Sequence, residues 1–190
     1  MELNSDPRWR RFNDATRTCP CCGQGFQGIF DIGYDHPQVW PHGNREASGQ
    51  DILEVGRDRL GTDLCEMDEH YFVRAILPIP IIGTDQYFAF GPWGSVSEKS
   101  FKAYVEANKS IAPTFDGCFS WLRNDLPGFE MDDWLPCDLE VEDPDQRPRL
   151  YVHEGTHELA NLQRNGMTFD RLLDVYAAAG QDIRPHLMDA

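Results

Sequence analysis

The stretch that decides the fold runs from residue 71 to residue 96. It begins as YFVRAILPIPII (71–82), turns at Gly83-Thr84-Asp85, and returns as YFAFGPWGSV (87–96). Runs rich in aromatic and β-branched residues on both sides of a short turn predict an antiparallel hairpin. Pro78 and Pro80 are two residues apart, so the N–H groups that they lack face the same side. The later part of the first strand is therefore expected at a sheet edge.

Helices and further strands surround this hairpin. Ser97 and Glu98 predict the start of an amphipathic helix that runs to Lys109. Thr168 predicts the cap of a last helix, which Gly180 ends. The other expected elements are a helix at 7–15 and strands at 26–32, 115–122, 137–141 and 150–153. Strands and helices in this order predict an α+β fold with a mostly antiparallel sheet and a few helices.

We expect a single domain over residues 1–190. Within it, residues 1–25 are predicted to form an N-terminal helix and a cysteine knuckle. Residues 26–180 are predicted to form the α+β core, and residues 181–190 a tail. No segment has the composition of a linker between two domains.

The chain is strongly acidic. It has 32 acidic and 17 basic side chains, a formal net charge of −15. Such a chain has no basic surface for phosphate backbones, and anionic membranes would repel it. We therefore expect neither a nucleic-acid nor a membrane partner. No long apolar run and no apolar N-terminal segment is present, which predicts a cytoplasmic protein.

The acidity is concentrated between residues 125 and 145, which hold nine Asp or Glu and no Lys or Arg. One interpretation is a solvated acidic loop. The other is a docking surface for a basic protein, because acidic surfaces steer such partners and aromatic residues anchor interfaces. For the docking surface the candidate residues are Phe129, Asp132, Asp133, Trp134, Glu140 and Glu142.

Six cysteines predict a reduced protein with a metal site. Cys19-x-x-Cys22-Gly has the spacing of a zinc knuckle, in which two thiolates point at one ion. Cys65 is the natural third ligand of a structural zinc. The fourth is expected to be His70 or Asp68, with Cys21 as an awkward alternative. A set of reduced, partly buried thiols without metal is the simpler interpretation.

Residues 153–157 read His-Glu-Gly-Thr-His and fit the pattern H-E-x-x-H of zinc peptidases. On a helix, His153 and His157 would share a face, and Glu154 would activate a metal-bound water. The context argues against this, because the motif follows a strand-like segment and Gly155 disfavours a helix. We instead expect the strand to end near His153, a turn at Gly155 and a helix capped by Thr156.

The chain resembles a bacterial family, domain of unknown function 2199. The residues that carry the resemblance are TCPCCG (18–23), DLCEMDEHYFVRAILPIPIIGT (63–84), FGPWGSVSEKSF (90–101), GCFSWLRNDLPGF (117–129) and RPRLYVHEGTHELANLQRNGMTFDRLLDVY (147–176). The resemblance implies that the Cys19-x-x-Cys22-Gly pattern, a cysteine like Cys65 and a histidine like His70 recur, which supports grouping Cys19, Cys22 and Cys65. It also implies Glu-Pro-Thr-Asp-His in place of residues 153–157, so that only His157 is shared. The resemblance implies no enzymatic or binding activity for this chain.

These features predict an acidic protein that binds a basic protein partner, with a structural zinc site. Its most concrete form is an immunity or inhibitor protein that blocks a basic toxin. One alternative is a zinc-dependent hydrolase that uses residues 153–157. Another is a small-molecule binder lined by Phe88, Phe90, Trp93 and Trp121.

Overall fold

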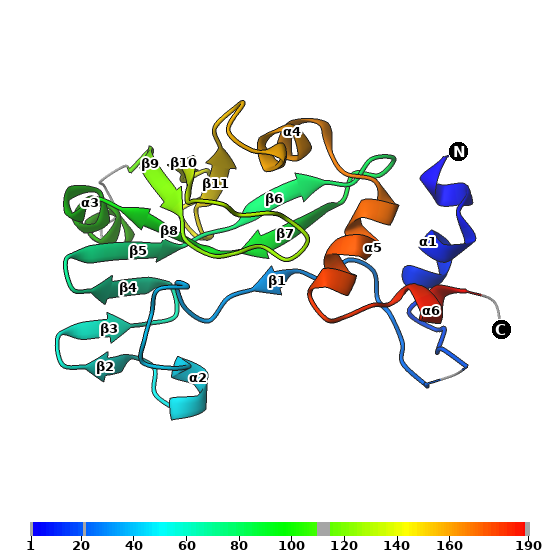
Figure 1. Cartoon of the computed structure of the whole chain (residues 1–190), viewed down its shortest axis with the longest axis horizontal. Coiled ribbons are helices and arrows are strands. Elements are labelled where there is room, and N and C mark those ends of the chain that lie inside the picture. Colours follow the sequence, from blue (N-terminus) through cyan, green and yellow to red (C-terminus); the bar gives the residue numbers. More distant parts are fainter. Residues whose placement is uncertain (1, 21, 110–114, 189–190) are drawn as a thin grey trace.

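The computed structural model describes residues 2–20, 22–109 and 115–188 (Figure 1). The chain folds as a single α+β domain with mostly antiparallel strands. Within the described residues, no helix combines the length and the apolar composition needed to cross a bilayer.

The central hairpin belongs to two sheets at once. Its first arm forms β5 (His70–Arg74) and β6 (Leu77–Pro80), and its second arm forms β7 (Tyr87–Gly91) and β8 (Trp93–Val96). β5 pairs with β8 in one sheet, and β6 pairs with β7 in the other. The predicted hairpin is therefore confirmed, but each arm is broken by a bend. The second arm breaks at Pro92, which has no N–H for a ladder, while Ala75 N still donates to Pro92 O (2.9 Å).

The larger sheet has eight strands in the order β11-β10-β9-β8-β5-β4-β3-β2, all antiparallel. Its other strands are β2 (Leu53–Val55), β3 (Asp58–Leu60), β4 (Leu64–Met67), β9 (Gly117–Leu122), β10 (Leu135–Glu140) and β11 (Arg149–Val152). The smaller sheet has the order β1-β7-β6, and β1 (Ile32–Gly33) runs parallel to β7. β6 lies at the edge, as its two prolines predict.

The helices lie around these sheets. They are η1 (Leu3–Ser5), α1 (Pro7–Phe12), α2 (Arg45–Ser48), α3 (Glu98–Lys109), α4 (Glu158–Asn165), α5 (Phe169–Ala178) and α6 (Arg184–Leu187). α3 has the predicted bounds, and Ser97 Oγ accepts from Ser100 N (3.1 Å). Thr168 caps α5 as expected. Residues 181–190, expected as a tail, instead contain α6, whose Leu187 is fully buried.

The apolar residues form two clusters. The main core joins the smaller sheet, one face of the larger sheet and the helices, with Phe12, Phe88 and Tyr176 among its buried rings. The second cluster holds Trp40, Leu60, Cys65, Phe72 and Trp93 on the other face of the larger sheet. Strands β2–β5 lie at one end of the molecule, and α1, α5 and α6 lie at the other (Figure 1).

Candidate metal centre and acidic face

The cysteine turn has the geometry of a knuckle. Cys19 N donates to Gln24 O (2.7 Å), and Gly23 N donates back to Cys19 O (2.8 Å). Gly23 has a φ of +74°, a left-handed conformation that glycine adopts without strain. The turn thus depends on the glycine of the Cys-x-x-Cys-Gly pattern. Cys19 is buried and Cys22 is exposed.

The third member of the group comes from the other end of the chain. His186 lies in α6, and its Nδ1 is 3.3 Å from both Cys19 Sγ and Cys22 Sγ. Two arginines fix this helix against the N-terminal segment: Arg11 donates to Leu187 O (2.7 Å), and Arg17 donates to His186 O (3.0 Å). The backbone that carries the imidazole is therefore held in place beside the knuckle.

The donor atoms fit a zinc ion. Cys19, Cys22 and His186 have their ligand atoms within 4.8 Å of one another. Tetrahedral zinc with typical Zn–S and Zn–N bond lengths places sulfur and nitrogen about 3.5 Å apart. The observed separation of 3.3 Å is close to that value. Two thiolates and one imidazole are also the ligand types that zinc prefers.

The structure does not bring Cys65 or His70 to this group. Cys65 is buried in β4, in the second cluster, opposite Leu60 and Phe72. His70 is the exposed first residue of β5. Both strands lie at the end of the molecule remote from α6 (Figure 1). The third member of the group is therefore His186, because tertiary packing, and not the position of the next cysteine in the sequence, decides which groups meet.

Burial in the second cluster keeps the Cys65 thiol protonated. It raises the pKa of the Cys65 thiol to about 12, with the nearby Asp58 and Glu66 adding to the effect. A thiol of this kind behaves as a small apolar side chain. The alternative ligand Cys21 lies outside the described residues, and Asp68 belongs to the tight turn between β4 and β5, with a φ of 53°.

Residues 153–157 form the turn that leads from β11 into α4. Gly155 has a φ of +74°, as expected for a turn. The cap of α4 is His157, one residue later than the predicted Thr156, because the imidazole Nδ1 accepts from Leu159 N (3.2 Å). His157 Nε2 lies 2.8 Å from Glu130 O, so both ring nitrogens are engaged. Glu154 pairs with Arg164.

This turn does not place the two imidazoles on one helical face. Among the described residues, the grouped donor atoms are those of Cys19, Cys22 and His186, and residues 153–157 supply none. His153 Nε2 lies 3.2 Å from Asp138 Oδ1 without hydrogen-bond geometry. The helix that H-E-x-x-H chemistry requires is absent over residues 153–157.

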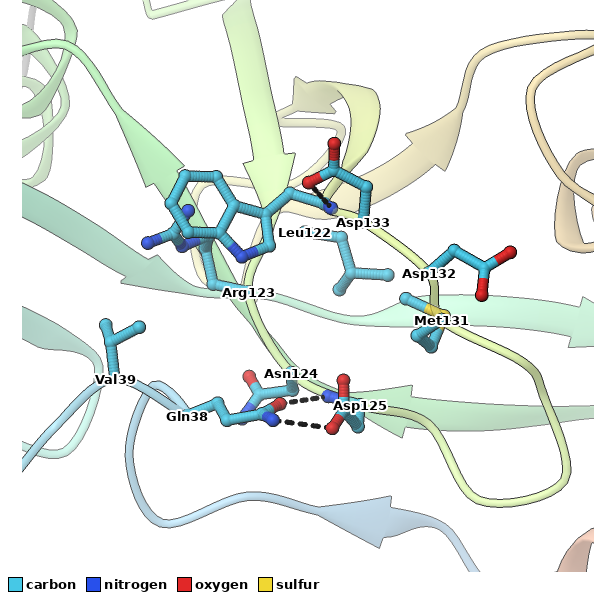
Figure 2. Close-up of a pocket in the computed structure, with 10 residues that line it drawn as sticks. Gln38, Val39, Leu122, Arg123, Asn124, Asp125, Met131, Asp132 and Asp133 are labelled. Atoms are coloured by element: carbon cyan, nitrogen blue, oxygen red, sulfur yellow. Dashed lines mark hydrogen bonds between the residues drawn. The ribbon is translucent and has the colours of Figure 1, made fainter.

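The acidic segment spreads over a loop, β10 and the turn into β11. Asp132 and Asp133 are exposed in the loop, and they line a small pocket (Figure 2). Glu140 is exposed at the end of β10. Glu142 is engaged with its own fold: its carboxylate accepts from Tyr151 Oη (2.6 Å) and pairs with Arg149 (2.9 Å).

The two aromatic candidates in this segment, Phe129 and Trp134, differ in their exposure to solvent. Phe129 is half-buried against the main core, 6.0 Å from the Phe90 ring, and Arg171 lies over it at 4.5 Å. It is therefore a packing residue of the fold. Trp134 is 50% exposed. Its ring lies against the guanidinium of Arg123.

Two aromatic residues that the sequence did not single out as partner-binding anchors lie beside Trp134. On β9, Phe119 is 48% exposed and Trp121 is 40% exposed, with ring centroids 5.1 Å apart. The register pairs Phe119 with Asp138 and Trp121 with Pro136, so these four residues share a face of the sheet. We call Phe119, Trp121, Trp134, Asp138 and Glu140 the β9–β10 face. Alternation with the buried Ser120 and Leu122 is the sequence signal that identifies it.

The aromatic residues proposed to line a small-molecule site do not form one surface. Phe88, Phe90 and Trp93 are fully buried. Phe88 and Phe90 pack in the main core and Trp93 in the second cluster, whereas Trp121 faces outward. Phe88, Phe90 and Trp93 therefore fill the interior of the fold.

A family model matches residues 18–167, with the description "uncharacterized protein conserved in bacteria" (DUF2199). The chain belongs to this family. No curated protein and no solved structure matches the chain. The DUF2199 match includes Cys19 and Cys22 but ends before α6, so His186 lies beyond the matched residues.

Proposed function

We propose that this DUF2199 protein binds a basic protein partner through the β9–β10 face. The observation that carries the proposal is the exposure of Phe119, Trp121 and Trp134 next to Asp138 and Glu140. Exposed aromatic side chains that adjoin one another are typical anchors of protein interfaces. The second cluster covers the same face of the larger sheet over β3, β4, β5 and β8, whereas Phe119 and Trp121 lie outside this cluster.

The acidic charge of this surface favours a basic partner. Residues 125–145 contain nine acidic and no basic side chains, in a chain of net charge −15. Such a surface attracts a basic protein over long distances and raises its association rate. An immunity or inhibitor protein that blocks a basic toxin is the most concrete form of this function. The free thiols of Cys65, Cys118 and Cys137 fit the reducing cytoplasm, where such a protein would act.

The test uses the full chain as bait for proteins of its host. A basic protein recovered at low salt is then titrated against the wild type and two matched triple variants. Asp132→Asn/Asp138→Asn/Glu140→Gln should weaken binding about tenfold or more, mainly through slower association. Asp51→Asn/Glu69→Gln/Glu106→Gln removes three exposed acidic groups elsewhere and should have little effect. Equal losses in both variants, or binding that salt does not weaken, would refute the proposal.

A second test addresses the aromatic anchors. Replacing Trp121 and Phe119 by serine should cost about tenfold or more in affinity, because both rings would be buried by the partner. Both side chains are about half exposed, so the free protein should keep its thermal unfolding midpoint within a few degrees. Unchanged affinity would place the interface elsewhere.

We also propose that Cys19, Cys22 and His186 bind a structural zinc ion. The support is the fit of the three donor atoms, described above. Protein purified without added metal should contain about one equivalent of zinc by elemental analysis, and less than about 0.2 equivalents would contradict a tight site. Cys19→Ser and His186→Ala should lose the metal. Cys118→Ser, on β9, should keep it.

A further inference from the structure

Asp138 lies in a row of aromatic side chains that crosses three strands. The register pairs it with Phe119 on β9 and with Tyr151 on β11. Residues directly opposite each other in antiparallel strands have neighbouring side chains on one face of the sheet. His153 joins this row, with its ring centroid 5.7 Å from that of Phe119 and its Nε2 3.2 Å from Asp138 Oδ1. Three aromatic rings therefore adjoin one carboxylate.

The same carboxylate lines a pocket of about 580 Å³, whose other lining residues come from β11, the turn after it and α4. Gln163 of α4 fixes the helix against the sheet. Its side chain accepts from Val152 N (2.8 Å) and donates to Leu150 O (2.8 Å). The pocket is thus built on a helix and a strand that are held together by hydrogen bonds.

Asp138 is the carboxylate of this pocket that no arginine or lysine neutralises. The other carboxylate that lines it, Glu154, pairs with Arg164. Among residues 2–20, 22–109 and 115–188, the one side chain that approaches Asp138 as an ion-pair partner is His153, and its Nε2 has no hydrogen-bond partner there. The Asp138 side chain is 57% exposed. With His153 neutral, the pocket carries one uncompensated negative charge.

We propose that this pocket receives an arginine side chain of the basic partner. The inference rests on the partner-binding function proposed above for the β9–β10 face and names the group that the face would select. A guanidinium forms two parallel hydrogen bonds with a carboxylate, and its flat faces stack on aromatic rings. Asp138 supplies the carboxylate, and its aromatic neighbours supply the rings. A lysine ammonium fits less well, because it is a strongly hydrated point charge without a flat face.

The experiment follows the imidazole Cε1–H resonance of His153 by NMR in the full-length protein, at about pH 8, where an imidazole is ordinarily neutral. The probe is N-acetyl-arginine amide. The comparisons, at matched ionic strength, are N-acetyl-citrulline amide, which is neutral and similar in shape, and N-acetyl-lysine amide. The arginine probe should shift the resonance saturably. The citrulline probe should bind about tenfold more weakly and the lysine probe about threefold more weakly. The resonance is identified by its loss in His153→Gln.

Three variants separate this site from a general attraction of cations. Asp138→Asn should weaken binding of the arginine probe about tenfold, because the paired hydrogen bonds lose their charged acceptor. Phe119→Leu should weaken it about threefold, the effect of one exposed ring on a cation. Asp145→Asn, an exposed acid of the same segment outside the pocket, is the matched control and should leave the affinity unchanged. All three positions are exposed, so each variant should keep its thermal unfolding midpoint within a few degrees.

Three results would overturn the arginine pocket. They are a shift that does not saturate, a citrulline or lysine probe that binds as tightly as the arginine probe, and equal affinity in the wild type and Asp138→Asn. These measurements need no partner, so they are separate from the search for one. A basic protein that binds through Phe119 and Trp121, in a chain that does not bind the arginine probe, would refute the pocket and leave the proposed function intact. A chain that binds the probe but no basic protein would refute the proposed function alone.

Discussion

At the scale of single residues, several positions are fixed by close backbone contact. Gly117 begins β9 with a φ of +138°, a conformation that other residues rarely adopt. A Cβ at this position would collide with the backbone oxygen of Leu139 on β10. Since the opposing atom belongs to the strand backbone, the sheet itself would have to move.

Gly117→Ala should therefore destabilise the protein by about 3 kcal/mol, the sum of backbone strain and overpacking. Gly43→Ala is the matched control, because Gly43 has a similar need for positive φ (+82°) but open space around its Cα. The control should cost about 1 kcal/mol. Urea unfolding measures both values, and equal losses would show that the contact with Leu139 is unimportant.

The cysteines should differ in reactivity according to burial. Cys22 is exposed, whereas burial raises the pKa of both Cys65 and Cys137 to about 12. Only the thiolate is a nucleophile, so the two buried thiols should resist iodoacetamide at neutral pH in the native protein. Peptide mapping after metal removal should find Cys22 alkylated first. Alkylation of Cys65 at a similar rate would contradict its placement.

At the scale of elements, the local pattern predicts a large part of the fold. The bounds of α3, the cap of α5 and the central hairpin follow from capping residues and from periodicity. The bend that sends β6 and β7 into a second sheet does not follow from these local signals, because it depends on how the two arms of the hairpin pack. β2, β3 and β4 were not expected either, since their short, polar strands acquire their pattern only through pairing.

One carboxylate links these short strands to the segment that covers the second cluster. Asp58, on β3, lies 2.6 Å from His42 Nε2 and accepts from Asp68 N (2.9 Å) in the β4–β5 turn. The His42 side chain, followed by the Asp68 N–H, lowers the pKa of Asp58 below its ordinary value of 3.8. The charged carboxylate is thus the form that the folded state favours.

A folded-state pKa below the unfolded one means that Asp58 stabilises the protein above pH 3.8 and that this contribution is lost as pH falls through the folded pKa. Asp58→Asn should consequently flatten the acid side of the stability–pH curve measured by urea unfolding. Hydrogen exchange at the Asp68 amide should also become faster in this variant. An unchanged pH dependence would mean that the His42 contact forms no effective pair in solution.

At the scale of the whole molecule, the proposed zinc ion would join the two ends of the chain. The knuckle lies near the N-terminus, and His186 comes from α6 near the C-terminus. α1 has its own anchor, because Trp9 and Phe12 are buried against Phe169 of α5. α6 is anchored by the buried Leu187, whereas Cys22 of the knuckle is exposed.

Removing the metal with a chelator should therefore loosen the molecule locally. Hydrogen exchange followed by mass spectrometry should speed up over residues 18–25 and 181–188, less over α1, and little in the sheets. His186→Ala should show the same pattern without chelator and should not respond further to it. Uniform acceleration across the chain would instead indicate that the metal supports the global fold.

The sequence by itself determined what depends on near neighbours in the chain. This includes the hairpin, the helix caps, the Cys-x-x-Cys-Gly turn and the concentration of charge in residues 125–145. Only the tertiary structure decided which distant groups meet. It brought His186 to Cys19 and Cys22, and it placed Cys65 in a separate core. It also buried Arg123, whose Nε has no hydrogen-bond partner among the described residues. The physical reason is that backbone propensity acts over a few residues, whereas burial and coordination depend on packing between segments far apart in the chain.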